Sequence, residues 1–489
     1  MIILELIQYE MLDHDFNMII LFILNSQNLI ILIVSKVNLI NKLNMKNIQG
    51  LFRFRQDLRL IDNTGFVQMY KDLGPNFAGL FIFDTTILDS FLPKDKRINF
   101  LLESLKSLEL QLNNLGIDLI LEYGKPLDSL KNLIKSKNIK IVYTNQSYGP
   151  YGKMRDKEIG GYCESVDVQF SMFDDYLLVK PEQVDFKKVF TPYYRHWDRV
   201  NKSNVDNFEF IKIGELDSSR GKQNQTIQKQ IFDKYAGEST NWTPAPPKDF
   251  FQDFDYSNYD NTRNLPYLLG SSRISPYLSF GQLSIRQIYH YVKSLDLDED
   301  TYIKELAWRD FWHHIHYYAP ATFQLEFQEK KRKLKWSYDS DSFKAWQDGM
   351  TGFPLVDAGM RQLKAENWMH NRVRMVVASF LCKDLLIDWR LGEAHFRNYL
   401  LDYDSNVNFG NWQWCAGVGA DPKPLRIFNP SLQAQRFDPE CEYIKKYIPE
   451  LKNVDKKSIL NPELHELPYA KPIVIHKLQT EKFKEIYYN

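Results

Sequence analysis

The segment RINFLLESLKSLELQLNNLG (97–116) decides how the amino-terminal half of the chain is interpreted. Its leucines recur at helical spacing and fall on one face of a helix: Leu101, Leu105, Leu108, Leu112 and Leu115. Gly116 follows, and glycine is the residue at which helices commonly end. Short apolar runs at 77–84 and 117–122 flank the segment, so it is predicted to be the crossover helix between two parallel strands.

The same alternation of short apolar runs and amphipathic helices extends from Asn47 to about residue 175. It predicts a parallel sheet with helices on its faces, with strands at 48–54, 77–84, 117–122, 139–143 and 166–170. Farther along, apolar positions recur at helical spacing without alternation at 282–295, 302–318, 354–364 and 372–386. The predicted fold class is therefore α/β plus all-α, with a Rossmann-like parallel-sheet domain, a long linker and an all-helical C-terminal domain.

Composition sets the predicted domain boundaries. The segment 179–248 is rich in Lys, Asp, Asn and Gln, ends in the proline-rich stretch 243–247, and is interpreted as the linker. It separates a sheet domain at 45–178 from a helical domain at 249–489. A length of 489 residues is in keeping with two large domains.

Charge and cysteine content narrow the class of protein. Apolar residues at 44% and charged residues at 25% exclude a disordered or fibrous chain. Because 62 basic residues balance 62 acidic ones, any nucleic-acid contact must come from a local basic patch. The four cysteines form no CxxC pair, which argues against a zinc site or a disulfide framework and favours a reducing, cytoplasmic setting: Cys163, Cys382, Cys415 and Cys441.

The first 44 residues are interpreted separately, as an extension. The apolar stretch 18–34 is interrupted by polar residues at 25–28 and is shorter than the ~20 residues of a membrane span. No cationic region precedes it and no small-residue cleavage site follows, which disfavours a secretory signal. Three interpretations stay open: a real extension, a marginal anchor, or an upstream start chosen in error. The strand pattern that follows Met45 favours the third.

Three polar clusters suggest chemistry. Asn371, Arg372 and Arg374 stand near the start of a helix predicted over 368–389, where guanidinium groups could face a polyanion; alone, they would also suit a solvated helix end. Carboxylates and amides at 402–413 lie beside two indoles and suit the edges of a planar redox cofactor. The loop 270–276 gathers hydroxyls and backbone N–H groups that can hold phosphates.

Over residues 45–489 the chain resembles the photolyase/cryptochrome family, most closely the class I cyclobutane pyrimidine dimer photolyases. The resemblance rests on long ordered motifs: FRFRQDLRLIDN (52–63), SSRISPYLSFGQLS (271–284), ELAWRDFW (305–312), WMHNRVRMVVASFLCKDLLIDWR (368–390), NFGNWQWCAGVGADPKPLRIFNP (408–430) and PIVIHK (472–477). It implies light-driven repair of cyclobutane pyrimidine dimers in UV-damaged DNA, with FAD active in its reduced form. We expect a monomer without an obligate protein partner or a membrane association.

The resemblance also implies roles for single residues. Asn408 would stand beside flavin N5, where an amide favours the reduced anionic cofactor. The remaining FAD-binding positions would be Tyr259, Ser271, Ser272, Arg273, Ile274, Ser275, Arg309, Asp402, Tyr403 and Asp404. Trp412, Trp389 and Trp336 match an electron relay from the flavin to the surface, although any single tryptophan is more often a core residue.

The lesion pocket implied by the family is also present. Glu305 matches the acid that hydrogen-bonds the dimer carbonyls, and a carboxyl kept protonated in an apolar pocket can donate in that way. Trp308 and Trp414 match the walls against which the two bases pack, and Asn371 and Met375 line the same cavity. The implied DNA contacts are Arg263, Glu305, Trp308, Trp312, Asn371, Arg372, Arg374, Arg426 and Gln433.

The second, light-harvesting chromophore stays open. The segment SYGPYGKMRDKEI (147–159) matches its neighbourhood, but the residues typical of folate-binding members are replaced around 151–153. Methenyltetrahydrofolate, a deazaflavin, another flavin and an empty pocket all remain as alternatives.

Other functions of the same family or with the same cofactor fit the sequence less well than repair. A cryptochrome photoreceptor without repair activity is the main alternative, and the complete lesion pocket disfavours it. A (6-4) photolyase would carry a histidine in place of Asn371, and the single-strand branch commonly a glutamine in place of Met375. A flavin reductase would leave the arginines unexplained.

Overall fold

The structure is a computed structural model that describes residues 5–6, 18–25, 28–35, 48–91, 93–211, 221–243, 246, 251–297, 301–423 and 425–488. The predicted start at Met45 and the end of the predicted linker at 247–248 lie outside these residues. Strands β1 (Glu5–Leu6), β2 (Met18–Asn25) and β3 (Asn28–Ser35) form a separate antiparallel sheet. Across the described chain, no helix has the length and apolar character needed to cross a bilayer.

A parallel sheet of five strands organises the sheet domain, in the order β6-β5-β4-β7-β8. The strands predicted from the sequence are confirmed with small shifts of their ends. They are β4 (Gly50–Phe54), β5 (Phe77–Asp84), β6 (Leu119–Gly124), β7 (Ile141–Asn145) and β8 (Gln169–Phe173). The strand order reverses between β4 and β7, which is where open α/β sheets characteristically bind ligands at the carboxyl ends of their strands.

The predicted crossover helix is α4 (Lys96–Asn113), which connects β5 to β6. Leu105, Leu108 and Leu112 are completely buried, so the leucine face packs into the core as the spacing predicts. The other helices of this domain are α2 (Thr64–Leu73), α3 (Thr85–Leu88), α5 (Pro126–Lys137) and α6 (Pro150–Ser165).

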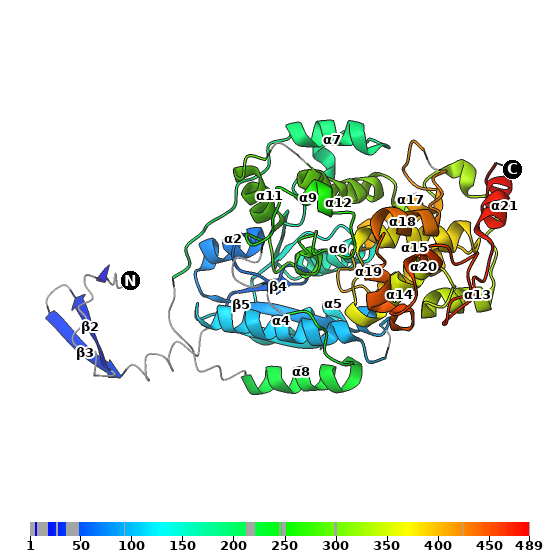
Figure 1. The fold of residues 1–489 in the computed structure, drawn as a ribbon. Helices are drawn as coiled ribbons and strands as arrows, with labels where there is room; N and C mark the ends of the chain where they lie inside the picture. The colour runs from blue at the N-terminus through cyan, green and yellow to red at the C-terminus, as the bar shows by residue number, and fades with distance from the viewer. Residues whose placement is uncertain are drawn as a thin grey trace.

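The predicted linker contains more structure than the sequence suggested. It holds η1 (Pro181–Gln183), α7 (Phe190–Arg199) and α8 (Gly221–Tyr235), and Figure 1 shows α8 along the outside of α4. Asn224 of α8 accepts from the Leu121 amide (3.2 Å) and donates to the Leu119 carbonyl (2.9 Å), which satisfies the outer edge of β6. Polar composition therefore concealed a helix that protects a sheet edge.

The second domain is helical, as predicted, and no strand occurs in the described part of 251–488. Its helices are α9 (Tyr259–Thr262), α10 (Ser275–Ser279), α11 (Ile285–Ser294), α12 (Thr301–Tyr318), η2 (Pro320–Phe323), η3 (Glu329–Lys331), α13 (Ser340–Asp348), α14 (Pro354–Glu366), α15 (Asn371–Lys383), α16 (Trp389–Tyr399), α17 (Ser405–Ala416), α18 (Pro430–Phe437), α19 (Glu442–Tyr447), η4 (Pro449–Leu451), α20 (Lys456–Leu460) and α21 (His476–Tyr488).

The prediction of a single helix over 368–389 is wrong, because α15 ends at Lys383 and α16 begins at Trp389. His370 caps the start of α15 by accepting from the Arg372 amide, and the helix ends before Leu386, whose φ of 59° lies in the left-handed region. Asp388 then caps α16 through the Arg390 amide. The apolar period hid the break because both helices bury their faces in the same core.

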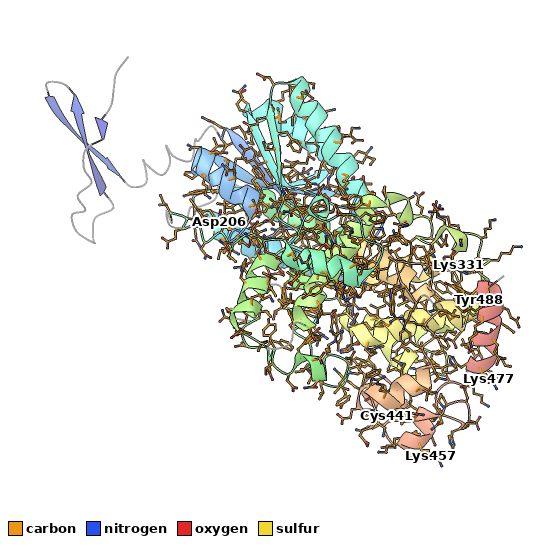
Figure 2. All side chains as sticks on the ribbon, turned by 90° about the horizontal axis from the view of Figure 1, so that it is seen from above. Asp206, Lys331, Cys441, Lys457, Lys477 and Tyr488 are labelled. Carbon is orange, nitrogen blue, oxygen red and sulfur yellow. The ribbon has the colours of Figure 1, made fainter. Side chains whose placement is uncertain are left out.

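Buried ion pairs join the two domains. Asp62 accepts from Arg286 Nε (3.0 Å) and from the Ser284 hydroxyl, while Asp175 pairs with both Arg59 (2.6 Å) and Arg286 (2.8 Å). The four cysteines are free and buried, and Figure 2 places Cys441 among the C-terminal helices.

Candidate functional site

One polar cluster joins α12, α17 and the segment after β8. Asp404 Oδ2 accepts from the Tyr176 hydroxyl at 2.7 Å and lies 3.3 Å from His313 Nε2. Arg309 donates to the Tyr176 carbonyl at 2.7 Å, and its guanidinium lies 4.0 Å from the Tyr176 ring centroid. Burial alone would raise the pKa of Asp404, but His313 and Arg309 hold it well below its usual value. Sequence reasoning named Arg309 and Asp404 but missed Tyr176 and His313, which lie far from them in the chain.

A second cluster surrounds Asn408 on α17. The Asn408 side-chain amide donates to Glu393 Oε1 at 3.1 Å, and the Tyr403 hydroxyl donates to the same oxygen at 3.0 Å. Burial raises the pKa of Glu393, which is 2% exposed. Glu393 was not predicted, because a glutamate within a helix looks like an ordinary surface residue until the fold buries it.

Asp402 is the clearest sign of a missing polar partner. Its Oδ2 pairs with Arg374 at 2.8 Å, whereas Oδ1 is buried and has no hydrogen-bond partner in the described chain. A buried acceptor without a donor is costly, at about 1–3 kcal/mol. The residues therefore fit a bound polar group such as FAD, whose amine, imide and hydroxyl groups can donate.

The side chains of the loop before α10, and of the first residue of α10, contact different parts of the helical domain. The Ser272 hydroxyl lies 2.7 Å from the Tyr302 hydroxyl, and Tyr302 packs against Tyr259 with ring centroids 5.0 Å apart. Arg273 instead pairs with Glu366 at 2.7 Å. Ser275 accepts from the Trp368 indole at 3.3 Å.

Glu305 and Arg263 form the next pair. Arg263 Nη1 lies 2.7 Å from Glu305 Oε1, and the two side chains are 24% and 31% exposed. Burial raises the pKa of Glu305, and the nearby guanidinium only partly offsets that rise. Glu305 therefore keeps its proton to a higher pH than a free glutamate does.

Two further guanidinium groups belong with this pair, and we call Arg263, Arg372 and Arg436 the arginine patch. Burial, Arg263 and Arg436 all lower the pKa of Arg372, so Arg372 lies close enough to both guanidinium groups to be repelled by them. Arg372 bonds the Asn264 side-chain oxygen at 2.7 Å and lies 4.5 Å from the Phe437 ring centroid. Arg436 was missed, although it lies one helical turn after the predicted Gln433.

The predicted lesion-pocket aromatics lie at the margin of one hydrophobic cluster, which Trp308 and Trp414 both border. Trp308 stacks on Phe190 at 3.6 Å, and Asn371 is exposed at the start of α15. The Arg426 guanidinium lies over the Trp414 ring, 5.2 Å from its centroid. Met375 is half-buried and packs against the neighbouring hydrophobic cluster. Arg426 pairs with Asp421 at 3.4 Å, and Gln433 keeps a buried oxygen that has no partner in the described chain.

Trp312 corrects the predicted set of DNA contacts. It is 2% exposed, and a Cβ at Gly410 would lie 2.2 Å from its indole, so α17 packs directly on this ring. A side chain so enclosed has no face to offer to DNA, and Trp312 is a core residue. The sequence could not show this, because Trp308 and Trp312 lie one turn apart on the same helix.

The three predicted relay tryptophans pack against different rings. Trp412 contacts Phe396 (4.9 Å), Trp389 contacts Phe409 (5.9 Å) and Trp336 contacts Phe483 (6.4 Å). Trp389 and Trp412 are buried, whereas Trp336 is only half-buried.

The sheet domain holds a second cationic cluster, Arg53, Arg55 and Arg155, which we call the sheet arginines. All three bond one carboxylate, Asp156, at 2.5, 2.8 and 3.3 Å. Arg53 is 2% exposed, its Nε and Nη1 have no partner in the described chain, and burial with its neighbouring arginines lowers its pKa to about 9. Asp84, at the carboxyl end of β5, accepts from the Tyr151 hydroxyl at 2.7 Å.

No group of three His, Cys, Asp or Glu side chains that could hold a metal ion occurs in the described ranges.

Comparison with known proteins matches both halves of the chain. Residues 51–209 match the DNA photolyase model, and residues 302–489 match the FAD binding domain of DNA photolyase. A deoxyribodipyrimidine photo-lyase from Alkalihalophilus pseudofirmus is 35% identical over 88% of this chain and 95% of its own length. The chain belongs to the DNA photolyase family. The residues at 302–489 accordingly form its FAD-binding domain.

Solved structures of the family superpose closely. An archaeal photolyase from Sulfolobus tokodaii with two FAD molecules aligns with a TM-score of 0.81 and 30% identity, covering 90% of this chain and 99% of that one. A cryptochrome from Synechocystis aligns with a TM-score of 0.77 and 26% identity, covering 90% and 100%. The family therefore contains both repair enzymes and cryptochromes with this fold.

Proposed function

We propose that this protein is a deoxyribodipyrimidine photo-lyase that repairs cyclobutane pyrimidine dimers in UV-damaged DNA with light. The observation that carries the proposal is Glu305, half-buried, with a raised pKa, and bonded to Arg263 at the edge of the arginine patch. A carboxyl with a raised pKa beside a cationic surface combines a group that can donate to a base when protonated with a binding surface for phosphates.

Reduced FAD supplies, when bound, the electron that opens the cyclobutane ring. Asp402, with its free oxygen, would accept hydrogen bonds from the cofactor, and Arg374 orients this carboxylate. Asp404 stays ionised because of His313 and Arg309, and is held in place by Tyr176. The Asn408 side-chain amide donates to Glu393, and this hydrogen bond fixes the orientation in which the amide would face the cofactor. Tyr259, Tyr403 and the loop at 271–275 complete the proposed cofactor contacts.

The lesion would lie between Trp308 and Trp414, with Asn371 and Met375 at its sides. Burial raises the pKa of Glu305, so the protonated carboxyl, which can donate to a carbonyl that gains negative charge, is favoured more than in a free glutamate. The arginine patch, with Arg374, Arg426 and Gln433, would hold the DNA backbone and position the duplex. Trp412, Trp389 and Trp336 would carry electrons between the cofactor site and the surface.

We further propose that the sheet arginines hold the anionic part of a second chromophore. They lie near the carboxyl ends of the strands where the strand order reverses: Arg53 is in β4, Arg55 follows it directly, and Arg155 is in the segment 147–159. Three guanidinium groups face two carboxylates, Asp156 and, at 3.6 Å from Arg155, Asp84, so a phosphate-bearing flavin or a deazaflavin fits the charge better than an uncharged ligand. The two FAD molecules of the Sulfolobus tokodaii photolyase support a flavin.

The free, buried cysteines support action in a reducing cytoplasm, and we propose that the protein works as a monomer.

The test is repair itself. The purified protein, reduced and mixed with an oligonucleotide containing one thymine dimer, is illuminated with near-ultraviolet or blue light, and thymine absorbance is followed beside a dark control. Light-dependent recovery in the native protein, strongly reduced in Glu305→Ala, is the expected result. Bound reduced FAD without any repair would instead favour the cryptochrome function of the Synechocystis neighbour.

A further inference from the structure

A parallel aromatic stack joins the linker to the helical domain. The ring of Phe190, the first residue of α7, lies on the Trp308 indole of α12, with ring centroids 3.6 Å apart and planes only 4° from parallel. Tyr194, one helical turn later in α7, stacks on Phe190 in turn at 5.8 Å. Figure 1 shows α7 beside α12. A residue of the linker therefore covers one face of the Trp308 ring.

Hydrogen bonds before and after Phe190 hold the linker against α12. The Lys187 amide donates to His314 Nε2 at 3.1 Å, and the Trp197 indole donates to Asp310 Oδ2 at 2.9 Å. Both acceptors are buried side chains of α12. Aromatic pairs prefer offset or edge-on packing to an almost exact face-to-face arrangement. The two anchors, rather than the preference of the rings, therefore set the stack of Phe190 on the indole.

Trp308 has few other contacts that could fix the plane of its ring. The side chain is half-buried, and its indole N–H makes no hydrogen bond within the described part of the chain. Phe311 meets the ring edge-on at 5.5 Å, and Trp312 lies tilted by 30° at 5.7 Å. The torsion that turns a tryptophan ring has a broad energy minimum, so the ring needs a flat neighbour to hold it in one plane. Phe190 is that neighbour.

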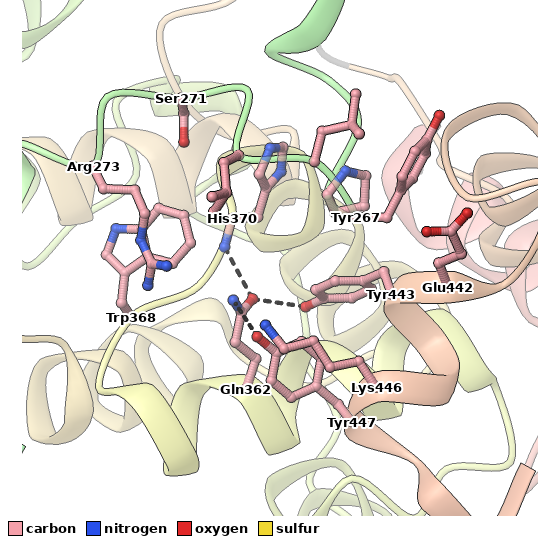
Figure 3. Close-up of a pocket in the computed structure, with 13 residues that line it drawn as sticks. Tyr267, Ser271, Arg273, Gln362, Trp368, His370, Glu442, Tyr443, Lys446 and Tyr447 are labelled. Atoms are coloured by element: carbon pink, nitrogen blue, oxygen red, sulfur yellow. Dashed lines mark hydrogen bonds between the residues drawn. The ribbon is translucent and has the colours of Figure 1, made fainter. Parts of the chain in front are cut away.

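Trp368, beside the loop before α10, is held in a different way. Its indole N–H donates to Ser275 at 3.3 Å, and the Arg273 guanidinium lies 4.4 Å from its ring centroid. Figure 3 shows Arg273 against Trp368 in the wall of a cavity whose lining does not include Trp308. Polar partners fix the orientation of Trp368, whereas Trp308 depends on an apolar ring.

We propose that Phe190 is a positioning residue for recognition of the lesion. It supports one face of Trp308, so that the opposite face lies in a fixed plane against which a base of the pyrimidine dimer packs. The inference rests on the proposed function, in which Trp308 is a wall of the lesion pocket. A platform that is already rigid binds a flipped base without first ordering its own side chain, and phosphate contacts do not depend on it.

Three variants isolate the stack. Phe190→Leu keeps an apolar side chain but removes the flat ring. Phe190→Tyr keeps the ring, and the half-buried position leaves its hydroxyl access to water. Phe186→Leu is the matched control, because Phe186 is also half-buried in the linker and packs on α12, but against His314 (5.8 Å) and Tyr318 (5.2 Å).

Binding is measured in the dark with the FAD-loaded, full-length protein and two duplexes, one with a single thymine dimer and one undamaged. We expect Phe190→Leu to bind the dimer duplex about 5-fold more weakly, the effect of losing one aromatic pair, and to bind the undamaged duplex as the native protein does. Phe190→Tyr and Phe186→Leu should match the native protein on both duplexes. A role in stability alone would not change the preference for the dimer.

Two outcomes overturn this inference alone. The first is a preference for the dimer that Phe190→Leu leaves unchanged. The second is tighter binding of the dimer by Phe190→Leu, which would show that the phenyl ring competes with the base for Trp308. A native protein without any preference for the dimer would overturn the proposed function as well.

The resonances of the Trp308 indole provide a test that needs neither DNA nor a variant at Phe190. In protein labelled on tryptophan, these signals are assigned by their loss in Trp308→Phe. The ring current of the stacked Phe190 should shift them upfield. Signals at the positions of an unstacked indole would overturn the inference, even if Phe190→Leu failed to fold.

Discussion

The sheet arginines and the arginine patch use the same residue type in opposite ways. Arg53, Arg55 and Arg155 converge on one buried carboxylate, and Arg53 is 2% exposed. In the arginine patch, Arg263 and Arg372 are partly exposed, and Glu305 is the carboxylate bonded to Arg263. Enclosed cations suit one small anion, whereas cations spread over a surface suit a long polyanion. The difference predicts stability effects in the first cluster and binding effects in the second.

The largest effect is expected from Asp156→Asn. Removing the carboxylate that all three arginines share leaves Arg53 buried without an ion-pair partner and leaves Arg155 with only its longer contact to Asp84 (3.6 Å), which costs about 3–5 kcal/mol of folding free energy. Urea unfolding of the variant measures it, with Glu158→Gln on the exposed face of α6 as the control. Equal midpoints for the two variants would contradict the comparison.

Arg372→Gln should act on binding and spare folding. We expect an affinity for DNA about 10-fold lower and a salt dependence reduced by about one counterion, because one phosphate contact is lost. Binding of lesion-bearing duplex at several salt concentrations checks this, with Arg332→Gln as the control, because Arg332 pairs on the surface with Glu329, three residues before it (3.4 Å). A loss of thermal stability without a change in salt dependence would show that Arg372 is structural.

A smaller effect is expected from pH. Because the pKa of Glu305 is raised, its carboxyl stays protonated at pH values where a free glutamate is ionised, and the donor is lost as the pH rises through the raised pKa. Repair at saturating DNA should therefore decline on the alkaline side, and Glu305→Gln, a permanent donor, should flatten the profile. Arg263→Gln removes the offsetting charge and should move the decline to higher pH. A native profile without any decline would exclude a neutral Glu305 as the donor.

The smallest effect is expected from Trp336→Phe. This half-buried tryptophan would end the relay at the surface, so its loss should slow light-driven reduction of the bound flavin by about 10-fold or less in the absence of added reductant. Absorbance of the flavin under continuous light measures the rate. Trp346→Phe, which alters a buried indole beside Trp412, serves as the control for packing.

Sequence patterns predicted the parts of this molecule that repeat with a local period. The leucine face of α4, the five strands and the main helices appear in the sequence because a helix or strand must alternate its buried and exposed sides. Long motifs likewise located the residues around Glu305 and Asp404. The sequence did not predict the linker helix α8 or the break between α15 and α16, because neither changes the local apolar pattern.

Contacts between distant segments were decided only by the tertiary structure. The packing of helices decides which residues meet. Examples are the hydrogen bonds of Glu393 with Asn408 and of Tyr176 with Asp404, and the close approach of Arg436 to Arg372. Burial also decided one case: the sequence predicted Trp312 as a DNA contact, but the side chain is 2% exposed and packs against α17 in the core. The sequence by itself determined the elements, the family motifs and the residue types available for chemistry. The fold decided which of them meet, because hydrogen bonding, burial and pKa depend on neighbours that no local pattern specifies.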